Sequence, residues 1–318
     1  MWDNSPDDLN SPESEPRAEP DPEEDPLTAS PETLFRPDIF GIPSPVPKIY
    51  PRRIPNLGHV LLFFVLALVM LGIGQVLGVF ILQLSHIFPH RGFDALFLLS
   101  TDDARASIPI QALSYGLIAL VVIPIFSVLW GEPFGQGVSW NSSEARHKAF
   151  RLALLGLTAG FGITLFGNYL PMPKNPPITQ DMMKSAAGAW MMLIFGLTVA
   201  PLLEELAFRG FLLPGLVNSF QWFADRGAIS KSAVKWIGIP VSVLLTSLGF
   251  AFMHSPQVSH AWGPLVLIGT VSIILCIVRL ALDSVAAGVV VHAAYNFTLF
   301  AGVLYQTDGF RHLDKLTS

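Results

Sequence analysis

Three short motifs place ionisable or strongly polar side chains inside apolar runs of this chain. The motifs are Glu204-Glu205-x-x-x-Arg209, Phe250-x-x-x-His254 and His292-x-x-x-Asn296. An ionisable side chain within an apolar segment is costly, and it usually has a partner or a function. Carboxylates and imidazoles are also the groups that most often move protons in acid–base catalysis. The three motifs are therefore the candidates for chemistry in this sequence.

The first motif combines two adjacent carboxylates with one arginine. Glu205 and Arg209 are four residues apart, so on a helix they share a face and are expected to form an ion pair. Glu204 lies about 100° round the same helix and has no cation at a pairing distance in sequence. A buried carboxylate in that situation suits a general acid or base near neutral pH. The alternative is a helix end at the membrane surface with its charges in water, but both flanks of the motif are strongly apolar.

The two histidine motifs are weaker when each is taken alone. A single histidine such as His254 is more often a hydrogen-bonded core residue, and His292 with Asn296 on one helix face is more often polar packing between helices. Both histidines nevertheless lie deep in apolar runs. At about 1.5 Å of rise per residue, Glu204, His254 and His292 lie roughly 18, 25 and 12 Å from the inner ends of their runs. One shared site is compatible with these depths.

The composition indicates a membrane protein. Only 14% of the 318 residues are charged, 51% are hydrophobic and the mean hydropathy is +0.52, whereas a soluble domain has about 25% charged residues. Apolar runs long enough to cross the hydrocarbon core of a bilayer lie at 57–84, 108–130, 149–170, 186–216, 237–258, 263–282 and 284–305. We expect an all-α, polytopic transmembrane helix bundle with about seven spans, and six to eight fit the pattern.

Composition also divides the chain into regions. We expect a disordered, acidic and Pro-rich tail at 1–45 and an N-terminal transmembrane region of about three spans at 46–185. A membrane core that carries the three motifs follows at 186–305, and a C-terminal tail at 306–318. Lys and Arg near the span ends favour a cytoplasmic N-terminus. No nucleic-acid partner is expected, because the negative net charge comes from the acidic tail and the remainder is only mildly basic.

The ordered set of motifs resembles the CAAX protease and bacteriocin-processing family (CPBP, or Abi) of intramembrane proteases. Each motif lies on its own apolar segment, in the order Glu-Glu-x-x-x-Arg, Phe-x-x-x-His and His-x-x-x-Asn. The segment from Asp283 to Gly288, just before the last motif, is also similar to that family. The resemblance covers roughly residues 186–300. It implies an all-helical membrane fold with a polar cavity that opens into the bilayer core.

The same resemblance implies a role for each motif residue. Glu204 would activate a water molecule with help from His254, while His292 and Asn296 would stabilise the oxyanion. Glu205, Arg209 and Phe250 would support the site, with Arg209 holding the glutamate pair in place. The implied substrate is a membrane-associated peptide or a lipidated protein, cleaved at CAAX-like C-termini or within small membrane peptides. Peptide hydrolysis needs an activated water and donors aimed at the developing oxyanion, and this set supplies both.

Two questions stay open at this level. Glu204, His254 and His292 could together bind a catalytic zinc ion, yet the same residues can also support a metal-free glutamate mechanism, and the signature His-Glu-x-x-His is absent. The chain could instead be a non-catalytic membrane immunity or scaffold protein of the same fold. A proton- or cation-coupled transporter also uses ionisable groups inside the membrane, but here these groups cluster in the C-terminal half.

Overall fold

All regular secondary structure in the described part of the chain is helical. The structure, a computed structural model, describes residues 53–88, 92–174 and 176–316. Within those residues there is no β-strand, and seven helical segments are long and apolar enough to cross a membrane. The prediction of an all-α bundle with about seven spans is confirmed, and the chain is an integral, multi-pass membrane protein. The predicted disordered tail, residues 1–45, lies outside the described residues.

The spans are either single helices or runs of shorter helical segments. The first three spans are α1 (Leu57–Ser85), α3 (Ala104–Trp130) and α6 (Ala149–Gly167). The fourth consists of α8 (Ala186–Leu197), α9 (Val199–Glu205), η2 (Leu206–Leu212) and α10 (Leu213–Asp225), and the fifth of α11 (Lys231–Ala233), η3 (Val234–Gly238) and α12 (Ile239–Met253). The last two are α13 (Trp262–Leu282) and α14 (Val285–Gln306). The remaining short helices are α2 (Phe93–Asp102), α4 (Phe134–Gly137), α5 (Ser142–His147), α7 (Pro177–Met183), η4 (Ser255–Val258) and η5 (Leu313–Leu316).

Several span boundaries differ from the sequence pattern by a few residues, and two of these differences affect the motif-bearing segments. The fourth run continues to Asp225, and not only to 216, because α10 is amphipathic and the carboxylate of Asp225 accepts hydrogen bonds from Arg53. The helix in the fifth run ends at Met253, whereas the apolar run reaches 258. Pro256 follows this helix end, and a proline cannot continue the helical hydrogen bonding. As a result His254 lies at the end of α12 and not within it.

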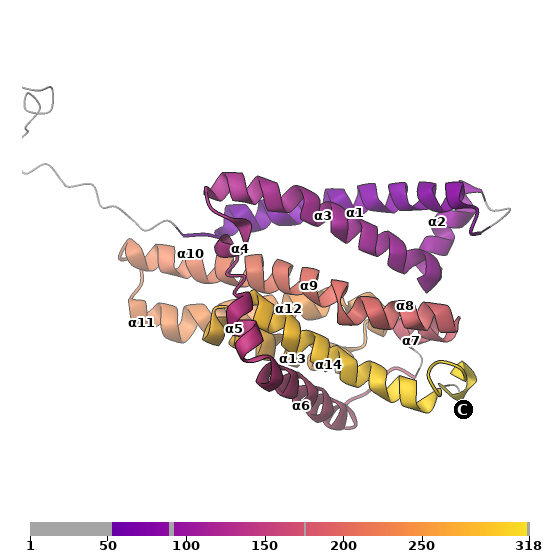
Figure 1. Cartoon of the computed structure of the whole chain (residues 1–318). Coiled ribbons are helices and arrows are strands. Elements are labelled where there is room, and N and C mark those ends of the chain that lie inside the picture. Colours follow the sequence, from indigo (N-terminus) through magenta and orange to yellow (C-terminus); the bar gives the residue numbers. More distant parts are fainter. Residues whose placement is uncertain (1–52, 89–91, 175, 317–318) are drawn as a thin grey trace, which may run out of the picture. The chain divides into compact units, whose positions relative to one another are not determined.

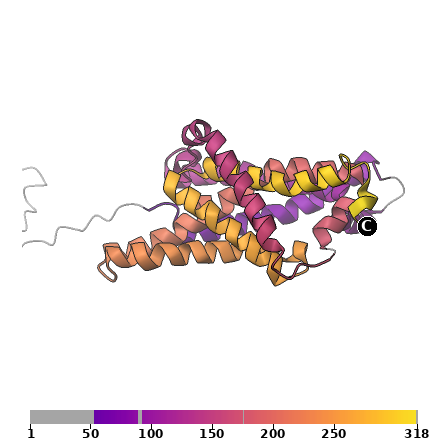
Figure 2. The ribbon, with the colours of Figure 1, turned by 90° about the horizontal axis from the view of Figure 1, so that it is seen from below.

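The spans pack in pairs that bring distant segments together. In Figure 1, α1 and α3 lie side by side, the run α8–α10 lies next to them, and α12, α13 and α14 follow. The third span, α6, packs against α14, the last one, and crosses it in the view of Figure 2. Because α14 contacts α6, α8, α9 and α13, it is the helix around which the motif-bearing segments assemble.

Glycines allow the closest of these helix contacts. A Cβ atom at Gly156 of α6 would lie 2.3 Å from the main-chain oxygen of Val291, and one at Gly160 would lie 1.9 Å from Oγ1 of Thr298. Gly156 and Gly160 are four residues apart, and this small-x-x-x-small spacing lets two membrane helices approach closely. The main chain of α14 is thereby held against α6.

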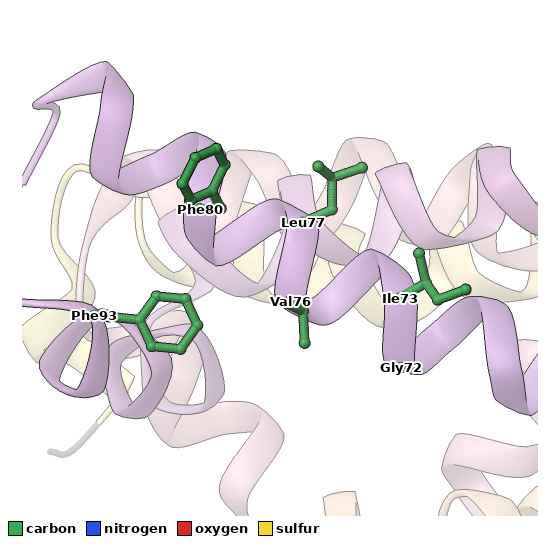
Figure 3. A pocket seen from close by; sticks show the side chains of 6 residues that line it. All are labelled: Gly72, Ile73, Val76, Leu77, Phe80 and Phe93. Carbon is green, nitrogen blue, oxygen red and sulfur yellow. The ribbon is translucent and has the colours of Figure 1, made fainter.

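Much of the outer surface of the spans is apolar, as contact with lipid requires. An apolar groove between α1 and α2 is one part of this surface (Figure 3). Its lining residues are Gly72, Ile73, Val76, Leu77, Phe80 and Phe93. None of these side chains is ionisable, and none belongs to the three motifs.

Enlarging Gly156 should disrupt the α6–α14 contact. We expect Gly156→Leu to lower the free energy of unfolding by at least about 1–3 kcal/mol, because the added side chain overlaps the main chain of α14. Thermal unfolding in detergent micelles measures the change. Gly162→Leu is the matched control, since a Cβ atom at Gly162 of the same helix meets nothing within 4 Å. Equal destabilisation by both substitutions would show that the close contact is not the cause.

Candidate active site

The fourth span is interrupted directly before the first motif. Thr198 lies between α8 and α9 with φ −122° and ψ −77°, which is outside the helical range. Pro201 follows three residues later and has no N–H with which to bond the carbonyl of Leu197. This loss explains why the helix breaks here. Glu204 and Glu205 then occupy the last turn of the short helix α9.

The segment that follows the two glutamates is a π-helix. In η2, Leu206–Leu212, the main-chain hydrogen bonds are wider than in an α-helix, and such turns are frequent at functional sites. Arg209 lies in the middle of η2. The widened turn still leaves its side chain on the same face as Glu205.

Glu205 and Arg209 form an ion pair that is fully buried. Nη1 of Arg209 donates to Oε1 of Glu205 at 3.0 Å, and both side chains are 0% exposed. Nη2 of Arg209 also donates to the main-chain oxygen of Ser272 at 3.0 Å and to its hydroxyl at 2.7 Å. The ion pair expected from the four-residue spacing therefore forms. Ser272 on α13, which the sequence motifs did not indicate, accepts two further hydrogen bonds from the guanidinium, while Nε of Arg209 has no acceptor among the described residues.

Glu204 lies beside two imidazole rings from two other helices. Its Oε2 atom is 3.8 Å from Nε2 of His254 and 3.7 Å from Nε2 of His292. The side chains of Glu204 and His254 are 14% and 16% exposed, so this point is partly accessible. Residues that are 50 and 88 positions apart from Glu204 in sequence thus converge on one carboxylate oxygen.

The second ring nitrogen of each histidine is held by an acceptor. Nδ1 of His254 lies 2.9 Å from the main-chain oxygen of Phe250, and Nδ1 of His292 lies 3.0 Å from Oε1 of Glu205. A carbonyl oxygen and an ionised carboxylate can only accept, so Nδ1 is the donor in both rings. Among the described residues, Nε2 is then the ring nitrogen left without a hydrogen-bond partner in each imidazole, and both Nε2 atoms lie nearest Oε2 of Glu204.

Phe250 packs against most of these groups. Its ring lies 4.7 Å from the ring of His254 and 5.8 Å from that of His292, and the guanidinium of Arg209 lies 4.7 Å from its centroid. Phe250 is 3% exposed. It therefore provides an apolar support that limits the orientations of both imidazoles.

Asn296 points to a different place from His292. Its Nδ2 atom donates to the main-chain oxygen of Gly196 at 2.7 Å. Gly196 lies in the last turn of α8, where carbonyl oxygens lack donors within the helix. Asn296 thus ties α14 to the break in the fourth span, and its proposed role at an oxyanion stays a prediction.

One glycine makes room for the buried carboxylate. A Cβ atom at Gly288 of α14 would lie 2.6 Å from Oε2 of Glu205, so no larger residue fits without moving that carboxylate. Gly288 is one helical turn before His292, on the same helix. The sequence showed Gly288 only as part of the segment before the last motif, and its contact with Glu205 requires the folded structure.

The group formed by Glu204, His254 and His292 is wider than a zinc site. In a tetrahedral zinc site each ligand atom lies about 2.0–2.1 Å from the metal, so two ligand atoms are about 3.4 Å apart. Here Oε2 of Glu204 lies 3.7 Å from Nε2 of His292 and 3.8 Å from Nε2 of His254. Among the described residues, no group of three or more His, Cys, Asp or Glu side chains is arranged to hold a metal ion. The residues therefore do not fit zinc in this arrangement, and no step below uses a metal.

Comparison with known proteins gives one match. Residues 186–298 match the family model described as Rce1-like, type II CAAX prenyl endopeptidase Rce1-like. The matched segment begins at the first residue of α8 and ends within α14, so it contains all three motifs. No curated protein and no solved structure matches the chain.

The buried ion pair should be strongly coupled. We expect Glu205→Gln and Arg209→Met each to lower the free energy of unfolding by about 3–5 kcal/mol, because each leaves an uncompensated buried charge. The double variant should cost clearly less than the sum, as measured by denaturant titration in detergent. The partly exposed pair Glu144–Lys148 is the control, and its double-mutant cycle should give at most about 1 kcal/mol. Additive effects at Glu205 and Arg209 would contradict the pairing.

Proposed function

We propose that this chain, whose membrane core from 186 to 298 belongs to the CPBP/CAAX protease family, is an intramembrane endopeptidase. It would hydrolyse peptide bonds of membrane-associated substrates with a water molecule activated by Glu204. The observation that supports this function best is the convergence of Glu204, His254 and His292 on one partly accessible point.

The two adjacent glutamates are suited to different tasks. Glu205 is fully buried, and its Oε1 atom is engaged by Arg209 and His292, so it is a structural charge. Glu204 has no arginine or lysine partner among its described contacts and is partly accessible. A carboxylate of the second kind can accept a proton during a reaction, because no cation competes for it.

The proposed reaction begins with a water molecule between Glu204 and the two imidazoles. Glu204 takes one proton while the water oxygen bonds to the carbonyl carbon of the scissile peptide. The resulting oxyanion is stabilised by hydrogen-bond donors, for which Nε2–H of a protonated His254 or His292 is positioned. The C–N bond then breaks, and the proton held by Glu204 passes to the leaving amine nitrogen. Water is the only co-reactant.

The substrate class follows from the family and from the position of the site. The matching model describes a CAAX prenyl endopeptidase, and Glu204 lies within a membrane span. We infer that the substrate is a lipidated protein with a CAAX-like C-terminus or a small membrane peptide. A cytoplasmic N-terminus, as the positive charges suggest, would bring such C-termini to the site from the cytoplasmic side.

A non-catalytic immunity or scaffold protein is the alternative. The hydrogen bonds of Asn296 and Arg209 would serve either protein, because they hold helices together. The partly accessible carboxylate of Glu204 beside two imidazoles favours catalysis. An ionisable group inside a membrane lowers stability, so a protein without a reaction to catalyse gains nothing from keeping it there. Full function of a Glu204→Gln chain in cells would favour the scaffold.

Removing the proton acceptor should abolish cleavage. We expect Glu204→Gln and His254→Ala to lower kcat/KM on a prenylated CAAX reporter peptide by about 10²–10⁴-fold, measured by mass spectrometry on protein purified in detergent. Glu144→Gln, at a partly exposed glutamate on α5 outside the three motifs, should match the wild type. Metal analysis of the same samples distinguishes a zinc-dependent mechanism from a metal-free glutamate mechanism. Stoichiometric zinc that disappears in both variants would overturn the metal-free step.

The space beside Glu205 should matter for cleavage as well. Gly288→Ala places a methyl group 2.6 Å from Oε2 of Glu205, which must displace the carboxylate that holds His292. We expect kcat to fall by about 10²-fold, as misplacements of about 1 Å can cause. Gly302→Ala on the same helix is the control, because a Cβ atom there meets nothing within 4 Å. Wild-type kcat in Gly288→Ala would show that this packing is not needed.

A further inference from the structure

A second buried arginine lies near the site and has no part in the proposed reaction. Arg279 is in the last turn of α13 and is 7% exposed. Its Nε atom donates to the main-chain oxygen of Arg209 at 3.1 Å, and its Nη1 atom donates to Oδ1 of Asp283. Burying an arginine at the end of a membrane span needs a reason, and its two acceptors suggest one.

The main-chain oxygen of Arg209 has lost its helical donors. In an α-helix it would accept from the N–H of Leu213, but that N–H donates to Phe208 in the wider π-helical pattern. The next donor in the π-helical pattern would be residue 214, which is a proline and has no N–H. A carbonyl oxygen without a donor is costly in a membrane. Arg279 supplies the missing hydrogen bond from a segment 70 residues away.

The carbonyl of Arg209 and the candidate site are joined by short contacts. The guanidinium of the same residue pairs with Glu205, and Glu205 accepts from Nδ1 of His292. Nε2 of His292 then faces Glu204. The main-chain position of Arg209 therefore determines where the imidazole of His292 lies relative to the proposed base.

Asp283 extends this connection to the start of α14. It lies in the turn between α13 and α14 with φ 43°, and its side chain is 79% exposed. The next residue, Ser284, is the N-cap of α14 and accepts from the N–H of Ala287. Arg279 thus bridges the π-helix that carries Arg209 and the turn that begins the helix carrying His292.

We propose that Arg279, held by Asp283, is a positioning residue that keeps the π-helix η2 in register with α14 and so aligns His292 with Glu204. Arg279 contacts neither of those two residues and acts only through Arg209. This inference rests on the proposed proteolytic function, since alignment matters only if the site carries out a reaction.

Full-length Arg279→Gln and Arg279→Lys protein tests the proposal. We expect Arg279→Gln to lower kcat on the reporter peptide by about 10²-fold with KM within about twofold of the wild type, because Arg279 contacts none of Glu204, His254 and His292. The lysine variant keeps the charge beside Asp283 but cannot donate in two directions from a planar group. Its kcat should therefore lie between that of the wild type and that of Arg279→Gln. Arg151→Gln, at an exposed arginine of α6, is the matched control and should behave as the wild type.

Hydrogen–deuterium exchange separates this proposal from the proteolytic function. The readout is exchange in the peptide covering 206–215, measured in the inactive Glu204→Gln background. Faster exchange confined to this peptide in Arg279→Gln, with the loss of kcat, supports the positioning role. Unchanged exchange and kcat overturn it, as does faster exchange along the whole chain, which would mean general destabilisation. If the wild type cleaves nothing, the proposed function fails, and local exchange alone decides whether Arg279 holds η2.

Discussion

An arginine that is fully buried within a membrane span needs a counter-charge and hydrogen-bond acceptors, and Arg209 obtains both from neighbouring helices. Glu205 supplies the negative charge, Ser272 supplies two acceptors, and Phe250 lies against the face of the guanidinium. These partners come from α9, α13 and α12. Two of these helices, α9 and α12, also position Glu204 and His254, so the partners of Arg209 help to bring these two residues together.

The π-helix and the break at Thr198 are two parts of one local arrangement. Pro201 and Pro214 lie on either side of the first motif, and each removes a main-chain donor from the fourth span. The carbonyl of Gly196, in the last turn of α8, and the carbonyl of Arg209, which Pro214 leaves without a donor, are bonded by side chains from α14 and α13. Irregular main chain inside a membrane is tolerated where protein groups replace the lost bonds. Here the replacements also join the fourth span to the two last ones.

The sequence alone predicted the membrane class, the seven spans and the pairing of Glu205 with Arg209, because these depend on composition and on spacing along one helix. It did not predict the π-helix, since Pro214 indicates a disturbed turn but not the pattern that results. The position of His254 at a helix end was also missed, although Pro256 was a visible signal. The hydrogen-bond acceptors of Asn296 and Arg209 could not be predicted. Gly196 is 100 residues from Asn296 and Ser272 is 63 residues from Arg209, and only tertiary packing brings such residues together.

The order in which the contacts of Glu205 can form has a consequence for synthesis of the chain. Arg209 is four residues from Glu205, so this ion pair can form as soon as the fourth span leaves the ribosome. His292 is 87 residues later, and at about 5–20 residues per second it is made roughly 4–17 s afterwards. Until then the fourth span carries a charge-neutral pair, while Glu204 still lacks the imidazole of His292. The short-range pair therefore lowers the cost of inserting this span, before α14 is present to assemble the site.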